Sequence, residues 1–207
     1  MSDPADRPYP KHAKPLAGEQ LRALAHPLRV RILDELSMYG PLTASGLGER
    51  LDESSGATSY HLRQLAQYGF IEDAPGPSRR DRWWRACHEI TSVPPAETEG
   101  EAFDMDVAFT QAILSLQVDQ MQKAVEEYAE LPLAWRKAST ASDIIIPLTS
   151  EKAEALTKRL NDLLMEAMCE APPLGEPLPS GTVPFTVMLH AFPYPGRLPH
   201  GEEESEP

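Results

Sequence analysis

Side chains able to contact nucleic-acid bases share one face of a helix that the sequence predicts at residues 56–68. On a helical wheel, the apolar residues of this segment lie on one side, and the opposite side has one cation and no carboxylate. The opposite side consists of Gly56, Ser59, Tyr60, Arg63, Gln64 and Gln67. Hydroxyl, amide and guanidinium groups of this kind bond to base edges in the major groove. The pattern predicts a recognition helix.

The beginning of this helix is a second candidate contact. Ser54 or Ser55 can cap it by accepting a backbone N–H bond. Ser55 and Gly56 are small enough for a nucleic-acid backbone to come close, and the helix dipole favours an anion at that end. We therefore expect a phosphate contact there.

An arginine cluster follows the helix. Its members are Arg79, Arg80, Arg82 and Arg85. Strands are predicted at 70–74 and 82–87, and the turn-rich loop 75–81 between them predicts a hairpin. The first three arginines then lie at its tip, where only Asp81 opposes them. Such a tip can hold phosphates or enter the adjacent minor groove.

The net charge of −13 is unevenly distributed along the 207 residues. Residues 1–16 carry a net charge of +1, residues 17–90 a net charge of −1, and residues 91–207 a net charge of −13. A phosphate responds to charge within a Debye length of about 8–10 Å. The acidic second half therefore does not exclude DNA binding by the first half, and we expect it to face away from DNA.

Three helices are predicted ahead of the recognition helix. The first begins at Gly18-Glu19, and the second begins at Pro27, where the missing N–H of proline has no cost, and ends near Gly40. The third is 44–51, with Thr43 as its cap, and a turn precedes the fourth. Helices, a turn and a two-stranded ribbon with a basic tip are the order of a winged helix–turn–helix domain. We predict such a domain at 17–90.

A long helix is predicted at 103–130, after a proline-rich, acidic linker at 91–102. Apolar residues recur along it at alternating spacings of four and three, as in a coiled coil. They include Val107, Leu114, Val118, Met121 and Val125. The stripe is either the core of a second domain or a dimer seam, and its width favours the seam.

The remaining segments complete an α+β chain with a small α/β region at its C-terminal end. Alternating residues predict strands at 143–148 and 182–192, although Pro147 and Pro184 interrupt them, and a helix is predicted at 151–169. We assign 103–192 to a dimerisation or effector region. Residues 1–16 are predicted to be a disordered arm and 193–207 a disordered tail.

The first half also resembles a known family. The stretches that carry the resemblance are LRALAHPLRVRILDEL, LTASGLGERL, ESSGATSYHLRQLAQYGFIED and RRDRWWRA. They are similar to the ArsR-like winged-helix regulators of bacteria, and most of all to the metal-independent branch common in actinobacteria. The resemblance covers residues 17–90 and implies a dimeric DNA-binding transcription factor. It implies that Ser59, Tyr60, His61 and Arg63 contact DNA.

The sequence departs from the metal-sensing members of that family. These carry a Cys-x-Cys element before the recognition helix, whereas residues 43–49 here contain no thiol. Others use histidines on the C-terminal helix, and residues 103–130 contain none. Thiolates and imidazoles are the ligands that zinc or copper sensing needs. We therefore expect no metal site and no cofactor.

The sequence thus predicts a sequence-specific transcriptional regulator that binds double-stranded DNA as a homodimer. A winged domain that has lost DNA binding and serves as a protein-interaction module is the alternative, although such a module need not keep the arginine cluster. No nucleophile or acid–base set indicates an enzyme.

Whether the protein binds a small-molecule effector stays open. Aromatic residues of the second half line either a ligand pocket or a core. These are Trp135, Phe185, Phe192 and Tyr194. No apolar run reaches the ~18–20 residues of a membrane span, and no secretory signal is recognisable at the N-terminus. We therefore expect a cytoplasmic, nucleoid-associated protein with no membrane partner.

Overall fold

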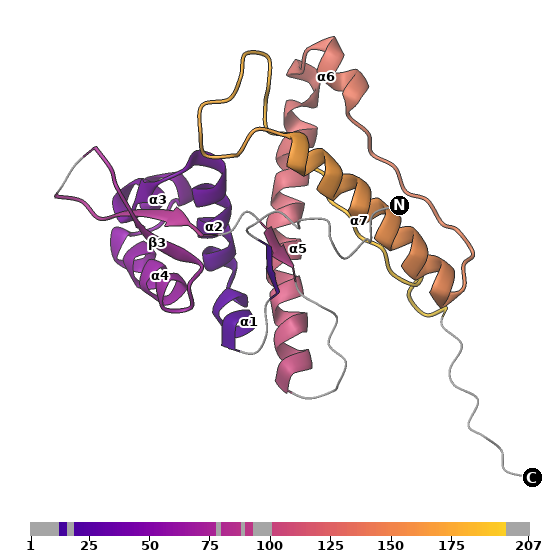
Figure 1. Cartoon of the computed structure of the whole chain (residues 1–207), viewed down its shortest axis with the longest axis horizontal. Coiled ribbons are helices and arrows are strands. Elements are labelled where there is room, and N and C mark those ends of the chain that lie inside the picture. The colour runs from indigo at the N-terminus through magenta and orange to yellow at the C-terminus, as the bar shows by residue number, and fades with distance from the viewer. Residues whose placement is uncertain (1–12, 16–18, 78–79, 88–89, 93–100, 198–207) are drawn as a thin grey trace, which may run out of the picture.

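The computed structural model describes residues 13–15, 19–77, 80–87, 90–92 and 101–197 (Figure 1). The helices are α1 (Glu19–Leu24), α2 (Pro27–Tyr39), α3 (Ala44–Leu51), α4 (Ser55–Gln67), α5 (Glu101–Glu127), α6 (Leu133–Ala138) and α7 (Ser150–Glu170), with a 3-10 turn η2 (Tyr128–Glu130) after α5. The strands are β1 (Ala13–Pro15), β2 (Leu42–Thr43), β3 (Ile71–Ala74), β4 (Trp83–Ala86) and β5 (Ile90–Ser92). Helices α1 to α4 and the sheet form one unit, and α5 stands beside it (Figure 1).

The first unit has an apolar core to which every one of its helices contributes. The core residues are Leu21, Ala23, Leu24, Leu28, Ile32, Leu36, Leu47, Leu51, Leu62, Leu65, Phe70, Ile71, Trp84 and Phe109. Most of them recur at helical spacing, which is the pattern from which the four helices are predicted. The predicted order of helices and wing is confirmed.

Side chains cap the beginnings of the helices in this unit. The hydroxyl oxygen of Thr43 accepts the Gly46 N–H at 3.1 Å and caps α3, as predicted. His26 caps α2, because its Nδ1 atom accepts the Leu28 N–H at 3.2 Å, and Pro27 is the first helical residue. The sequence analysis missed this cap, since histidine is not a usual capping residue.

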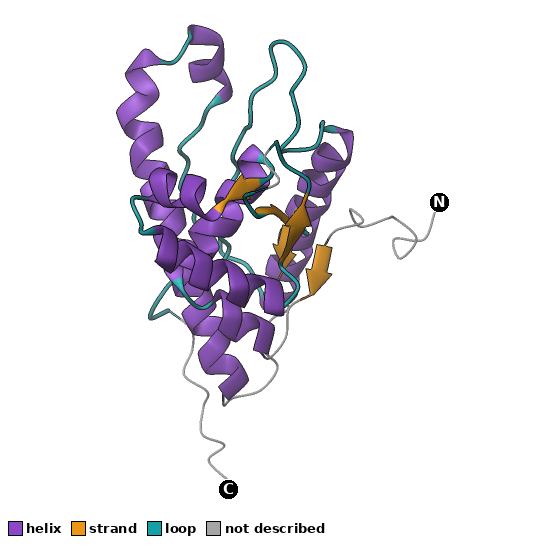
Figure 2. Cartoon of the chain, turned by 90° about the vertical axis from the view of Figure 1, so that its left-hand side faces the viewer, coloured by secondary structure: helices purple, strands orange, loops and turns teal. Residues whose placement is uncertain are grey.

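The wing is a three-stranded antiparallel sheet with the order β2-β4-β3 (Figure 2). Strand β3 pairs with β4 from Ile71 opposite Ala86 to Ala74 opposite Trp83. Strand β2, which was not predicted, adds to the other edge of β4 with Leu42 opposite Trp84. Trp84 is buried and Trp83 half-buried, as expected for neighbours that point to opposite faces of a strand.

Helix α5 has two faces with different surroundings. On one face, Phe109 and Ala112 are buried against the winged unit, and Phe109 joins its core. On the other face, the predicted seam is exposed, with exposed fractions from 38% at Val118 to 77% at Val125. The predicted long helix is confirmed, and α7 and its cap Thr149 also lie where the sequence places them.

The predicted strands at 143–148 and 182–192 are wrong for this single chain, because both segments are coil. Their alternating side chains are typical of strands, but a strand also needs a hydrogen-bonded neighbour. Within the described part of the chain, no backbone-to-backbone hydrogen bond involves 143–148 or 183–192. The short helix α6 was not predicted.

The two ends of the chain also differ from expectation. Strand β1 pairs in parallel with β5, so the predicted disordered arm contains three ordered residues, and the predicted linker begins within a strand. Residues 1–12 of the arm, 93–100 of the linker and 198–207 of the tail lie outside the described residues. In the described ranges, no helix is both long and apolar enough to cross a membrane.

Candidate nucleic-acid interface

Helix α4 is held against α3 by its apolar face. Leu62 and Leu65 are fully buried, and Thr58, also fully buried, donates its hydroxyl to the Ala44 carbonyl at 2.7 Å. At the beginning of the helix, the Ser54 hydroxyl oxygen accepts the Ala57 N–H at 3.1 Å. These contacts fix the rotation of α4 about its axis and therefore which side chains face outward.

The turn between α3 and α4 is tight. Asp52 adopts a left-handed backbone with φ 55°, and the Glu53 N–H donates to the Gly48 carbonyl at 2.9 Å. A Cβ atom at Gly48 would lie 2.7 Å from the Glu53 carbonyl oxygen. Gly48 is therefore required by the close approach of the turn to α3, a role that the sequence analysis missed.

The outward face of α4 carries most of the predicted contact residues. Tyr60 is 54% exposed, Arg63 and Gln67 are exposed, and Ser59 and Gln64 are half-buried. At the start of the helix, Ser55 and Gly56 are exposed as well. The structure thus brings these predicted residues to one accessible surface.

Carboxylates border the beginning of α4. Glu49, Asp52 and Glu53 line a shallow, open depression together with Ser54 and Ser55. The dipole at a helix start attracts anions, but these three side chains oppose a phosphate at the same place. The sequence analysis predicted a phosphate contact at Ser55 and Gly56 without considering these three carboxylates, although the sequence contains them.

His61 lies away from the outward face and packs against His26. The two ring centroids are 4.4 Å apart, both rings are half-buried, and in the described structure His61 Nδ1 has no hydrogen-bond partner. Burial lowers the pKa of both rings, and the nearby Arg29 lowers it further. The His61 ring therefore packs against the beginning of α2.

The wing arginines are partly engaged with carboxylates on the neighbouring strand. Arg82 donates to both carboxylate oxygens of Asp73, at 2.5 and 2.8 Å, and its guanidinium lies 3.9 Å from the Trp84 ring centre. The hydrogen bond from Arg82 lowers the pKa of Asp73. Arg85 bonds to Glu72 at 2.8 Å. The wing is therefore less basic than its sequence indicates.

Two other wing arginines complete the predicted set. Arg80 is exposed at the tip of the hairpin, and Arg79 lies outside the described residues. The pairs of Arg82 and Arg85 are solvent-exposed, so each contributes little to stability. A phosphate can replace a carboxylate in such a pair at small cost.

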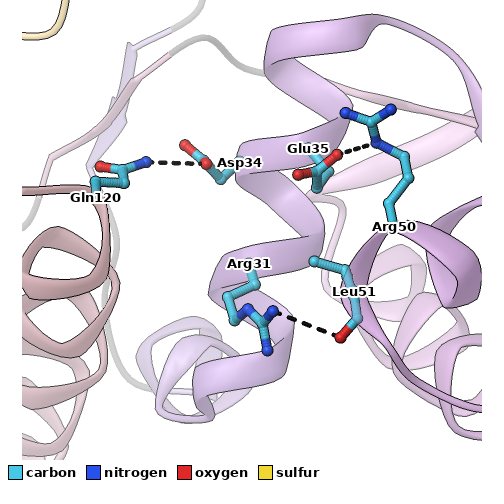
Figure 3. Close-up of polar contacts among 6 residues, drawn as sticks. All are labelled: Arg31, Asp34, Glu35, Arg50, Leu51 and Gln120. Atoms are coloured by element: carbon cyan, nitrogen blue, oxygen red, sulfur yellow. Dashed lines mark hydrogen bonds and ion pairs between the residues drawn. The ribbon is translucent and has the colours of Figure 1, made fainter. Parts of the chain in front are cut away.

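Helix α2 makes one polar contact with α5 and two with α3 (Figure 3). Gln120 of α5 donates to Asp34 at 3.1 Å, and Arg50 of α3 forms an ion pair with Glu35. Arg31 donates to the Leu51 carbonyl at the end of α3 at 3.5 Å. Burial raises the pKa of the Asp34 carboxyl. Helix α2 thus contacts both α5 and α3, and α3 supports α4.

The fold and this surface define a winged helix–turn–helix domain. Residues 24–74 match a family model described as a helix-turn-helix domain. This match agrees with the geometry of α3, the turn and α4, and it confirms the predicted helix–turn–helix domain. The ArsR-like family and its metal-independent actinobacterial branch stay predictions.

Several solved structures are similar to part of the chain. Reduced HlyU from Vibrio cholerae is 22% identical over 42% of this chain and 78% of its own, with a TM-score of 0.29. The homodimeric winged helix-turn-helix DNA-binding domain of Mb0332 from Mycobacterium bovis, described as a possible ArsR-family regulator, is 20% identical over 48% and 74%, with a TM-score of 0.31. NolR from Sinorhizobium fredii is 23% identical over 35% and 80%, with a TM-score of 0.29. At these scores the domain assignment depends on the family model and the geometry alone. No curated protein matches the chain.

Proposed function

We propose that this protein is a DNA-binding transcriptional regulator that acts as a homodimer. Helix α4 enters the major groove with Ser59, Tyr60, Arg63, Gln64 and Gln67 toward the bases. The wing lies on the adjacent backbone. Such a protein resides in the cytoplasm with the nucleoid.

One observation carries this proposal. The outward face of α4 combines a cation, an aromatic hydroxyl and amide groups without any carboxylate, in a domain that matches the helix-turn-helix family model. Arginine and amide side chains are those that pair with guanine and adenine edges. The acidic surface at the start of α4 favours phosphate contacts at Arg63 and the wing over contacts at Ser55 and Gly56.

The exposed face of α5 supports the homodimer. Val107, Leu114, Val118, Met121 and Val125 are all exposed on the side of α5 that does not face the winged unit. A contiguous apolar stripe of this length is unusual on a monomer. Two copies that share it would present two recognition helices with two-fold symmetry, which requires an operator with inverted half-sites.

The ion pairs of the wing favour a second candidate function. Asp73 and Glu72 neutralise Arg82 and Arg85, which is expected if the winged domain binds a protein and has lost DNA binding. The same pairs are compatible with DNA binding if they exchange for phosphates. The two functions therefore predict different effects on DNA binding when the charge of the winged domain's arginines is reversed.

The test is an electrophoretic mobility shift with the DNA that flanks the protein's own gene. The double variant Arg63→Glu/Arg80→Glu should abolish the shift, because it replaces two phosphate or base contacts with repulsion. Each arginine that contacts a phosphate should also add about 0.9 to the slope of log binding constant against log salt.

The matched control is Arg136→Glu/Arg197→Glu. It changes the net charge by the same amount at two exposed positions of the second half, and it should shift DNA like the wild type. Unfolding temperatures should agree among the three proteins, since all four arginines are exposed. Equal DNA binding by the first variant and the wild type would refute the docking of α4 and favour the interaction module.

A further inference from the structure

The segment 183–189 has the side-chain pattern of a strand without a neighbour. Its odd-numbered residues are apolar and exposed, with exposed fractions of 47% at Val183, 56% at Phe185, 55% at Val187 and 37% at Leu189. Of its even-numbered residues, Pro184 and Thr186 are exposed and Met188 is half-buried. In a strand the four odd-numbered side chains would share one face, and here all four are exposed.

The backbone of the segment is open as well. In the described residues, none of its N–H or carbonyl groups forms a backbone-to-backbone hydrogen bond. An extended apolar segment with free backbone groups is a template for strand addition. Pro184 lacks an N–H, but successive residues of a strand direct their N–H groups to opposite edges. The edge formed by the odd-numbered residues therefore contains no proline.

One contact ties the residue after this segment to α5, and another ties the segment itself to α6. The His190 ring and the Gln117 side-chain oxygen of α5 are hydrogen-bonded at 2.8 Å, and Phe185 stacks on Trp135 of α6 with ring centres 6.4 Å apart. Gln117 directly precedes Val118 of the seam. A molecule that covers the seam is therefore also within reach of the segment.

We propose that a second copy of this chain covers the segment, and that residues 183–189 of the two copies pair as antiparallel strands across the two-fold axis. The inference rests on the proposed homodimer and extends its interface from α5 to the C-terminal region. A two-fold axis perpendicular to a strand brings identical segments together antiparallel, so the same open edge serves both copies.

A second copy fits this surface better than an unrelated partner for two reasons. The His190–Gln117 hydrogen bond ties the residue after the segment to the helix that carries the seam, so one docking event buries both parts. The paired strands would also place eight apolar side chains, four from each copy, on one face. An intersubunit sheet of this kind satisfies the free backbone groups of both copies at once.

The test compares two proline variants of the full chain. Val187→Pro removes an N–H from the pairing edge, whereas Thr186→Pro removes one from the opposite edge, as Pro184 already does. Sedimentation velocity over a concentration series should show the dimer dissociation constant of Val187→Pro raised at least tenfold. Thr186→Pro should stay within about threefold of the wild type.

Amide hydrogen exchange on the wild type gives an independent result. The amides of the odd-numbered residues should be protected when the protein is dimeric and should lose protection on dilution below the dissociation constant. Protection that persists after dilution would mean pairing within one chain, and would overturn the proposal. Free exchange in the dimer, or equal dimerisation by the two proline variants, would overturn it too.

These outcomes separate the inference from the proposed function. A dimer that shifts DNA while residues 183–189 exchange freely contradicts the strand pairing and leaves the regulator intact. A protein that dimerises as expected but shifts no DNA contradicts the regulator alone. A protein that is monomeric at every concentration contradicts the strand pairing and the homodimer together.

Discussion

The two halves of the chain differ in the burial of their apolar side chains. In the winged unit, the helices and the sheet enclose a shared core from Leu21 to Trp84. In the described range 101–197, Phe109 and Ala112 are the two buried apolar residues, and both face the winged unit. Among the residues that the structure describes, 24 large apolar side chains are exposed, and 22 of them belong to the second half. The first half thus has a core, to which Phe109 of α5 contributes, whereas most large apolar side chains of the second half stay exposed.

The difference shows what local sequence patterns can and cannot encode. Both halves have periodic apolar residues, and α5 and α7 form as readily as α2 and α4. Periodicity decides which side of an element is apolar, whereas burial depends on what packs against that side. In the winged unit, the packing elements are close in sequence. In the second half, we assign that role to another copy of the chain.

The largest expected effect is on the winged core. Leu62→Ala leaves a cavity at a fully buried site of α4 and should lower the free energy of unfolding by about 2–5 kcal/mol. Leu163→Ala on α7, at a side chain that is 63% exposed, should change the winged unit's unfolding by less than about 0.5 kcal/mol. Urea denaturation measures both. Equal losses would show that the second half has a core of its own.

The next effect concerns the turn before the recognition helix. Gly48→Ala should cost about 1–3 kcal/mol, because the new methyl group meets the Glu53 carbonyl oxygen. The matched control is Gly46→Ala on the same helix, where the new methyl group meets the Thr43 hydroxyl at an ordinary 3.4 Å. It should be neutral or stabilising, since alanine favours helices. If thermal unfolding ranks the two alike, the turn is not as tight as described.

A smaller effect should appear with pH. His26 and His61 have pKa values lowered from 6.5 by burial and by Arg29, while Glu53 acts in the opposite direction. The unfolded chain then binds protons more readily. Stability should therefore be complete above about pH 6.5 and fall as the pH decreases below it. Protonation of His26 at Nδ1 would also break the cap of α2.

Thermal unfolding between pH 7.5 and 5.5 checks this effect. The wild type should lose a few degrees of unfolding temperature over that range, and His61→Gln should lose less. The control His190→Gln lies in the second half and should keep the wild-type profile. A wild-type unfolding temperature that rises on acidification would contradict the described environment of the pair.

The sequence predicts the parts of the site that depend on neighbours along the chain. The outward face of α4, a serine cap at Ser54 or Ser55 and the cap Thr43 of α3 all follow from local spacing and residue type, and the structure selects Ser54. The ion pair of Arg82 with Asp73 was missed because it depends on the register between two strands. The packing of His61 against His26 was missed because it depends on how α4 lies against the start of α2.

Residues 143–148 and 182–192 were predicted as strands because their apolar residues alternate, but alternation alone does not make a strand. Val183, Phe185 and Val187 have the alternating spacing of a strand in the sequence, and all three are exposed in the structure. Alternation indicates which face of a strand is apolar, but it carries no information on which backbone pairs with it. A prediction from one sequence therefore cannot tell a neighbour in the same chain from one in a second copy.

The central claim is that two copies of α4 read one DNA site, and selection from a random pool of duplex DNA tests it most directly. The wild type should enrich two inverted half-sites whose centres are about 10–10.5 bp apart, or a multiple of that distance. Arg63→Glu/Arg80→Glu should enrich nothing. A wild-type selection without any enriched sequence, or with the same sequences as that variant, would contradict the account.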